Sequence, residues 1–287
     1  MTVLDQQLEV KLEHFITDAL AEDIGSGDHT SQACIPADER SNAKLLVKDP
    51  GVLAGVEVAR RIFHHVDPGS SVAVHMEDGS PVSQGDIAFE VECNTQALLK
   101  AERLVLNTMQ RMSGIATLSN RFYFEIEDLP VKILDTRKTT PLIRFLEKWA
   151  VRLGGCHNYR DGLYDWFMIK DNHVEACGSV SKAIEAVAAY QKEKGLNLPL
   201  TVEVRNLVEL YETMETGMVT RIMFDNFELP LLAEAVATVN KRFETEASGG
   251  VNINNIRKVA LTGVDYISVG ALTHSAVSLD LSLKIVK

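Results

Sequence analysis

The spacing of hydrophobic residues changes near Pro130, and the change divides the chain into two parts. Before that point, apolar residues recur at helical spacing over 8–20, which predicts an amphipathic helix. Alternating positions predict strands within 42–56, where they flank a turn, and at 72–76 and 87–91. Helical spacing returns from Thr95 to about Phe124 and predicts one long helix. The first part therefore combines helices with a small, mostly antiparallel sheet.

Beyond Pro130, short apolar runs alternate with helical patterns. Six runs predict strands, at 131–134, 166–169, 200–204, 221–224, 243–247 and 265–269. Helices are predicted at 141–152, 178–194, 206–216, 229–242 and 252–262. This alternation is typical of βα units whose strands lie parallel in one sheet. Six strands are fewer than the eight of a complete α/β barrel, so the pattern favours an incomplete or distorted barrel.

These patterns predict an α/β protein with two domains. Residues 1–115 are expected to form a smaller α+β open-sandwich domain, and residues 116–274 an incomplete (β/α) barrel that is catalytic. The closing letters, LSLKIVK, alternate again. We therefore expect 275–287 to rejoin the first sheet.

Composition narrows the range of functions. With 46% hydrophobic and 24% charged residues, the chain resembles ordinary soluble globular proteins. Its formal net charge of −11 argues against nucleic acid as a partner, because that partner requires a basic surface. No apolar run is long enough to span a membrane, and the acidic N-terminus is unlike a signal peptide. Four cysteines without a CxxC pair suit reduced thiols, so we expect a cytoplasmic protein.

A basic segment stands out in this acidic chain. Residues 134–173 carry seven Lys and Arg against five acidic residues, with His157 and His173 in addition. A local positive charge of this kind suits a site for small anions.

The same segment contains the ends of the first two predicted strands. Charged or glycine residues end each of the six strands, at 135–138, 170–173, 203–205, 225–226, 246–250 and 270. Functional residues of α/β barrels cluster where the strands end. If the fold is a barrel, all these groups converge at one mouth.

Two acids and two glycine-rich loops suggest what the mouth binds. Glu203 and Asp225 end neighbouring strands, where they could share Mg²⁺ or hold vicinal hydroxyls, although salt bridges to the cations opposite would also explain them. Ser248, Gly249 and Gly250 precede a helix, and Gly270 follows the last strand. Backbone N–H groups in such loops bind phosphate, although each loop could also be a simple turn.

These residues indicate a barrel enzyme that handles a phosphorylated substrate and a second anion, with Mg²⁺. Lys170 could instead form a Schiff base, as in barrel aldolases, and a phosphate-binding module without turnover is a third possibility.

On the long helix, Arg103, Asn107 and Arg111 lie opposite the apolar face. They form either a solvated surface or an anion site shared with another subunit. The loop at 21–31 is read as a turn, with Asp28 or Thr30 as a cap.

Several longer motifs carry a resemblance to a known family. They are EDIGSGDHTS, ERLVLNTMQRMSGIAT, LDTRKTTP, EKWAVRLGG, MIKDNH, FDNF, EASGGVN and DYISVGALTHS. Together they make the chain similar to the quinolinate phosphoribosyltransferases, also called nicotinate-nucleotide pyrophosphorylases (carboxylating), over nearly its whole length. The resemblance implies transfer of a phosphoribosyl group from phosphoribosyl pyrophosphate to quinolinate. Nicotinate mononucleotide, pyrophosphate and CO₂ would result, as a step of NAD biosynthesis.

The resemblance also implies roles for individual residues. Arg137, Arg160 and Lys170 match the cations that hold the two carboxylates of quinolinate. Arg103 matches an arginine that the neighbouring subunit supplies, which implies a homodimer or higher even oligomer with shared sites. Lys138 would meet the pyrophosphate.

The acids and the glycine loops have family counterparts too. Glu203 and Asp225 match residues that hold Mg²⁺ and the ribose. The match to the 5′-phosphate site covers Ser248, Gly249, Gly250 and Gly270, with His274 beside it.

Two positions depart from the family pattern. Tyr159 occupies the usual position of a histidine, and His157 lies two residues earlier, so either residue could supply that contact. Arg205 stands where an acid is common, and it could alter the charge beside Glu203. A phosphoribosyltransferase of the same scaffold that acts on another base is the nearest alternative function.

Overall fold

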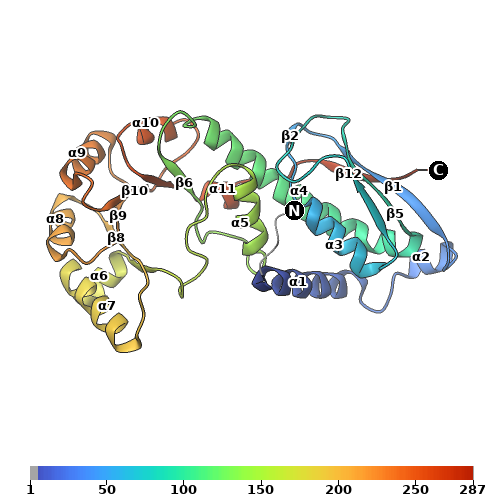
Figure 1. Ribbon diagram of the computed structural model, residues 1–287, viewed down its shortest axis with the longest axis horizontal. Coiled ribbons are helices and arrows are strands. Elements are labelled where there is room, and N and C mark those ends of the chain that lie inside the picture. The colour runs from blue at the N-terminus through green and yellow to red at the C-terminus, as the bar shows by residue number, and fades with distance from the viewer. Residues whose placement is uncertain (1–5, 287) are drawn as a thin grey trace. The chain divides into compact units, whose positions relative to one another are not determined.

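The computed structural model describes residues 6–286, which belong to two compact units (Figure 1). The first unit takes the chain up to Asn120, together with Thr139–Gly155 and the residues from Thr273 onward. The second unit contains Arg121–Lys138 and Cys156–Leu272. No helix among the described residues is both long enough and apolar enough to cross a membrane.

The first unit is built on an antiparallel sheet of four strands. Their order is β12 (Leu281–Val286), β1 (Arg40–Val47), β5 (Ile87–Asn94) and β3 (Ser71–Val74). The last strand pairs with the first from Asn42↔Val286 to Val47↔Leu281. The prediction that the C-terminal residues rejoin this sheet is therefore confirmed.

Helices complete the first unit. They are α1 (Gln6–Ile24), α2 (His29–Cys34), α3 (Val56–Val66), α4 (Thr95–Phe124), whose last turn enters the second unit, and α5 (Arg144–Leu153). The predicted bounds of α4 are confirmed, and its apolar stripe is buried, as Val105, Met109 and Met112 illustrate. Between α3 and β5, the rings of Phe63 and Phe89 meet edge to face in the core, 6.0 Å apart.

Two local predictions in this unit need correction. The second strand within 42–56 exists as β2 (Gly51–Val52), but it pairs with β4 (Pro81–Val82) rather than with β1. Helix α3 was not predicted. Its first N–H groups are capped from a distant loop, because the Asp78 carboxylate accepts hydrogen bonds from Val56 N at 2.8 Å and Glu57 N at 3.3 Å. In the loop at 21–31, Asp28 does cap a helix, by accepting from Ser31 N at the start of α2.

The second unit contains a parallel sheet of six strands. Their order is β6 (Lys132–Leu134), β11 (Tyr266–Ser268), β10 (Glu244–Ser248), β9 (Arg221–Asp225), β8 (Leu200–Val204) and β7 (Phe167–Ile169). The first and second strands of this unit lie at the two edges, so the sheet follows the order of a barrel that is open between β6 and β7. The predicted incomplete barrel is confirmed, and so are its six strands.

Helices follow the strands on the outer side of this sheet. They are α6 (Asp171–Cys177), α7 (Val180–Lys194), α8 (Leu207–Thr216), α9 (Leu229–Val239), α10 (Ile256–Ala260) and α11 (Ala271–His274), which ends in the first unit. Figure 1 shows α8 and α9 outside strands β8 to β10. Helix α6 was missed, because it begins immediately after Lys170 within a motif read as a loop.

The open edge beside β6 is lined by an extended segment. His157 forms a parallel bridge with Leu134, donating from its N to Ile133 O at 2.8 Å. Asp135 N then donates to His157 O at 3.0 Å. Residues around His157 therefore continue the sheet past β6, and they bring Tyr159 and Arg160 toward the strand ends.

Candidate active site

The carboxyl ends of the six parallel strands bring most of the predicted site residues of the second unit to one edge of its sheet. Residues that pair in register on adjacent parallel strands point to the same face. Asp225 at the end of β9 pairs with Ser248 at the end of β10, and Asn226 N donates to Ser248 O at 2.8 Å. The acid and the first residue of the glycine loop are therefore direct neighbours.

Gly249 is required by the packing of this loop. Its φ of 92° is in the left-handed region, and an added Cβ would lie 2.2 Å from the Asn226 side-chain oxygen. The Asn226 amide also donates to Asp225 Oδ2 at 2.9 Å. Glycine here lets the loop after β10 lie against the loop after β9.

Lys170 and Glu203 form an ion pair across β7 and β8. The Lys170 ammonium donates to Glu203 Oε2, and the Glu203 side chain is only 8% exposed. Lys170 stands at the turn into α6, where its backbone N donates to His173 Nδ1 at 3.0 Å. The salt-bridge interpretation of Glu203 is thus observed, and the pair leaves one carboxylate oxygen outside this contact.

Arg137 and Arg160 form a pair of like charges near the end of β6. Arg160 is half-buried and donates to Trp166 O at 3.3 Å. Burial, and then the positive charge of Arg137, lower the pKa of Arg160. Within the described chain, no carboxylate lies within 4.0 Å of either guanidinium. Two neighbouring cations with no carboxylate in direct contact are a natural site for an anion.

Tyr159 and His157 have different environments. Tyr159 N donates to the buried Asp135 carboxylate at 2.8 Å, and its hydroxyl lies 2.7 Å from Thr201 Oγ1 on β8. Burial raises the pKa of this phenol. The His157 ring is more exposed, and partial burial followed by the charge of Lys132 lowers its pKa. The Tyr159 side chain therefore belongs to the interior of the sheet, whereas His157 contributes backbone hydrogen bonds.

The interior of the sheet is strongly polar, which sequence analysis missed. Arg221 is buried on β9 and pairs with Glu244 at 2.9 Å and with Glu246 at 3.1 Å. Glu246 is fully buried and also accepts a short hydrogen bond from Ser268. The charged residues within the predicted strands RIMF and FETEA, namely Arg221, Glu244 and Glu246, could have indicated this polar interior.

The remaining site residues of this unit are more exposed. Lys138 N donates to Thr136 Oγ1 at 3.1 Å, and its side chain is exposed. Gly250 has a φ of 62°. Its carbonyl accepts from the side chains of Asn252 and Asn255. Gly270 lies two residues after β11 and directly precedes α11.

Three other predicted residues belong to the first unit. Arg103 is largely exposed and lies 3.4 Å from Glu102, the residue before it. His274 Nδ1 lies 2.8 Å from the Ser275 hydroxyl. Arg111, on the same helix as Arg103, is partly buried and is already paired within the first unit. It binds the buried Glu147 carboxylate, and it donates to carbonyl oxygens at 273 and 276.

Arg205 directs its charge away from Glu203. Its guanidinium pairs with Glu209 at 2.6 Å and with Glu175 at 3.5 Å. These acids raise the pKa of Arg205, chiefly through the hydrogen bond to Glu209. The unusual arginine is thus neutralised at the surface.

The donor set can be compared with what a metal requires. Within residues 6–286, no group of three or more His, Cys, Asp and Glu side chains could hold a metal ion. Glu203 and Asp225 lie on adjacent strands, because Glu203 pairs in register with Met223, two residues before Asp225. Two carboxylates fit Mg²⁺, which usually takes one or two protein oxygens and completes its shell with water and substrate phosphates.

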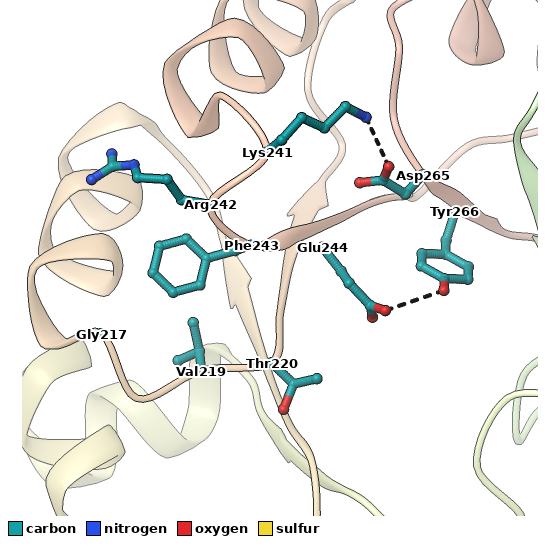
Figure 2. A pocket seen from close by; sticks show the side chains of 9 residues that line it. All are labelled: Gly217, Val219, Thr220, Lys241, Arg242, Phe243, Glu244, Asp265 and Tyr266. Atoms are coloured by element: carbon teal, nitrogen blue, oxygen red, sulfur yellow. Dashed lines mark hydrogen bonds and ion pairs between the residues drawn. The ribbon is translucent and has the colours of Figure 1, made fainter.

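A hollow lies at the opposite end of the same sheet (Figure 2). It has a volume of about 520 Å³ and lies where Thr220 leads into β9 and Asp265 leads into β11. Figure 2 shows two contacts within it, an ion pair of Lys241 with Asp265 and a hydrogen bond from Tyr266 to Glu244. The amino ends of barrel strands serve stability rather than chemistry, so the active site is assigned to the other end.

Comparison with known proteins shows to which family the chain belongs. Two family models match, the quinolinate phosphoribosyl transferase N-terminal domain over residues 28–113 and its C-terminal domain over residues 115–284. A mitochondrial quinolinate phosphoribosyltransferase (decarboxylating) of Nicotiana tabacum is 46% identical over 284 residues, which cover 93% of this chain and 80% of the relative. A probable nicotinate-nucleotide pyrophosphorylase (carboxylating) of Bacillus subtilis is 40% identical, covering 97% of this chain and 93% of the relative.

Solved structures show the same relationship. The crystal structure of NadC from Streptococcus pyogenes matches with a TM-score of 0.91 at 34% identity, and the match covers both chains completely. Since both family models and relatives of high coverage match, the chain belongs to the quinolinate phosphoribosyltransferase family.

Proposed function

We propose that the carboxyl end of the parallel sheet is where this chain carries out the decarboxylating phosphoribosyl transfer of its family. Phosphoribosyl pyrophosphate and quinolinate are the substrates, and nicotinate mononucleotide, pyrophosphate and CO₂ are the products. The observation that carries the proposal is the like-charged pair Arg137 and Arg160. The two guanidiniums interact, and no carboxylate of the described chain lies within 4.0 Å of either one.

Quinolinate suits this pair because it carries two adjacent carboxylates. Guanidinium groups bind carboxylates in two-pronged geometry, which fixes orientation as well as charge. Lys170 is the third cation, and Glu203 holds its ammonium in place from the next strand. A monocarboxylate such as nicotinate would leave part of this positive charge without a partner.

Phosphoribosyl pyrophosphate would occupy the ends of the later strands. The proposed 5′-phosphate site consists of Ser248, Gly249, Gly250 and Gly270, with His274 beside it. Backbone N–H groups can approach an oxyanion closely where glycine replaces a side chain. Lys138 would bind the pyrophosphate, and Glu203 and Asp225 would hold the ribose hydroxyls and Mg²⁺. When bound there, Mg²⁺ would neutralise part of the pyrophosphate charge.

The chemistry then needs little covalent help from the protein. The ring nitrogen of quinolinate attacks C1′ of the ribose, and the C1′–O bond breaks with its electron pair on pyrophosphate. The charged residues align the two substrates and stabilise charge at the reacting centre. The ring nitrogen is now positive, so the electrons left when the adjacent carboxylate departs as CO₂ are stabilised beside it. A proton from solvent replaces CO₂ on the ring.

Arg103 extends the proposal to an oligomer. We propose that it reaches the quinolinate site of a second copy in a homodimer or higher even oligomer. Its side chain is 59% exposed, which leaves it accessible to such a contact.

A cytoplasmic location stays a prediction. The Nicotiana tabacum relative is named mitochondrial, and the name of the Bacillus subtilis relative gives no compartment.

A turnover assay tests the function directly. Purified protein with quinolinate, phosphoribosyl pyrophosphate and Mg²⁺ should release CO₂ in equal amount to nicotinate mononucleotide. Turnover of nicotinate but not of quinolinate would show that another base is the acceptor. Binding without any turnover would identify a binding module instead. Borohydride with a carbonyl substrate should leave Lys170 unlabelled, whereas labelling would support a Schiff-base aldolase.

A further inference from the structure

Arg221 is enclosed by aromatic rings and carboxylates inside the parallel sheet. Its guanidinium carbon lies 3.7 Å from the ring centre of Tyr266, 5.0 Å from that of Tyr159 and 5.2 Å from that of Trp166. It forms ion pairs with Glu244 and Glu246. Two of these partners, Glu244 and Tyr266, also line the hollow of Figure 2 at the amino end of the strands.

This arrangement is more specific than burial of a charge requires. A buried arginine needs hydrogen-bonded counter-ions, which the two glutamates supply. The three rings add cation–π contacts and restrict the plane of the guanidinium. Arg221 is the first residue of β9, which is an interior strand of the sheet. Its contacts therefore join β9 and β10 to the segment that lines the open edge.

That segment is held at several points by the same cluster. Tyr159 is fixed through its backbone N by Asp135 and through its hydroxyl by Thr201. Trp166 donates from its ring nitrogen to the same Thr201 hydroxyl, at 2.9 Å. The two rings meet edge to face, 5.5 Å apart.

Arg160 follows Tyr159 directly and is tied to the cluster a second time. Its guanidinium donates to the backbone oxygen of Trp166 at 3.3 Å. Arg160 is therefore bonded to Tyr159 in the chain and hydrogen-bonded to Trp166, and the rings of both residues pack against Arg221.

We infer that Arg221, together with Glu246, is a positioning residue for quinolinate binding, which acts on Arg160 through Tyr159 and Trp166. The inference rests on the proposed function only in assigning Arg160 to a quinolinate carboxylate. It gives the Tyr159 side chain a role in positioning Arg160 through contacts in the interior of the barrel. The phenol does this through Thr201 and the ring through Arg221.

The main test compares steady-state constants for Arg221→Lys with those of the unmodified chain. Lysine keeps a positive charge beside Glu246 but cannot stack as a plane between the rings. We expect the KM for quinolinate to rise by about tenfold to a hundredfold, because small misplacements of a binding group weaken alignment strongly. The KM for phosphoribosyl pyrophosphate should change by less than about twofold. Equal changes in both constants, or none in the quinolinate constant, would overturn the inference.

A matched pair of tyrosine variants separates positioning from general loss of packing. Tyr159→Phe and Tyr266→Phe each remove one hydroxyl from a ring that packs on Arg221. Only Tyr159 adjoins Arg160, whereas the Tyr266 hydroxyl donates to Glu244 at 3.2 Å, on the side of the hollow in Figure 2. We expect Tyr159→Phe to raise the quinolinate KM and Tyr266→Phe to leave it unchanged. The same effect from both variants would contradict the inference.

Two further measurements keep the test decisive. If Arg221→Lys fails to fold, the double variant Arg221→Met with Glu246→Gln removes both charges together, a change that buried pairs often tolerate. It should fold and still raise the quinolinate KM, and a normal KM would refute the role. Arg160→Ala tests the proposed function separately. If Arg160→Ala weakens quinolinate binding while all Arg221 variants bind normally, the inference fails and the proposed function stands.

Discussion

At the scale of single residues, the contact between Lys170 and Glu203 decides the charge of the proposed quinolinate site. Glu203 is buried, and its carboxylate is close enough to the ammonium to hold it in one position. Sequence analysis offered a metal ligand and a salt-bridge partner as alternatives for this acid. The structure contains the salt bridge, and substrate or Mg²⁺ would have to bind in its presence or rearrange it.

Glu203→Gln should therefore lower kcat/KM for quinolinate by about tenfold or more, which corresponds to ~1.4 kcal/mol of lost transition-state stabilisation. The amide cannot hold Lys170 by charge. Steady-state kinetics check the change, and Glu175→Gln is the control. Glu175 is 71% exposed and pairs with Arg205 outside the mouth, so this variant should retain full activity. Equal kinetics of the two variants would refute the role of Glu203.

Gly249 is the residue where backbone geometry should matter most. Gly249→Ala places a methyl group against Asn226 in a left-handed conformation, which should cost about 1–3 kcal/mol of stability and raise the KM for phosphoribosyl pyrophosphate. Gly195→Ala is the matched control, with φ of 63° and no atom within 4 Å of an added Cβ. It should show the strain without a kinetic change. Denaturant titration and kinetics measure the two effects, and a normal KM for Gly249→Ala would count against the phosphate site.

At the scale of secondary-structure elements, buried charges join segments that are distant in the chain. In the first unit, the Glu147 carboxylate on α5 accepts from Arg111 on α4 and from Thr140 N at 3.0 Å. Arg111 in turn donates to Thr273 O and Ala276 O. The buried carboxylate thus connects α5 to α4 and to the loop before α5, and Arg111 adds contacts to the end of α11 and to the residues after it.

Glu147→Ala should lower the free energy of unfolding by about 3–5 kcal/mol, because it leaves the Arg111 charge partly buried without its partner. Urea denaturation measures the change. Glu193→Ala removes an acid whose side chain is 68% exposed beside Lys194 and should change stability by less than about 0.5 kcal/mol. A small effect of Glu147→Ala would mean that water replaces the carboxylate at this point.

Helix α10 is attached to the segment before β6 by an exposed pair. Arg257 donates to both oxygens of Asp128 at 2.8 Å, and this hydrogen bonding lowers the pKa of Asp128 to about 2. A lowered carboxyl pKa gives stability that is present above the unfolded value of 3.8 and is lost as the pH falls toward about 2. Asp128→Asn should therefore lower the Tm at pH 6, by no more than about 3 °C, since the pair is exposed.

The pH dependence distinguishes this pair from a general acid effect. Thermal melts of the two proteins should converge as the pH approaches 2, where the unmodified Asp128 is itself protonating. A Tm difference that stays constant down to this pH would show that the pair contributes no pH-dependent stability.

At the scale of the whole molecule, our proposal places Arg103 in the site of a second subunit. Arg103→Ala and Lys170→Ala should each lose quinolinate turnover while remaining folded. Mixed in equal amounts, they should recover roughly a quarter of full activity, because about half of the dimers are mixed and each of those has one intact site of two. Assays after mixing, with subunit exchange confirmed by tags of different mass, measure the recovery. Confirmed exchange without recovery would contradict a shared site.

The sequence predicted those features of the fold that depend on residues close together in the chain. Strand periodicity located all six parallel strands, and the charged and glycine residues at their ends predicted a site at the mouth. Resemblance to a family then supplied roles for those residues. The same reasoning missed α3 because its cap, Asp78, lies more than twenty residues from the helix start. It missed the role of Arg221 because RIMF reads as an apolar run with one polar end.

The sequence by itself determined the alternation of strands and helices, the family and the residues available for chemistry, since these depend on local spacing and residue type. Only the tertiary structure decided which charges meet. It pairs Lys170 with Glu203 and buries Arg221 beside Glu246. It also brings Arg137 and Arg160 together with no carboxylate of the described chain within 4.0 Å of either guanidinium. Pairings of this kind depend on strand register and on distances between residues far apart in the chain, and no local pattern encodes those distances.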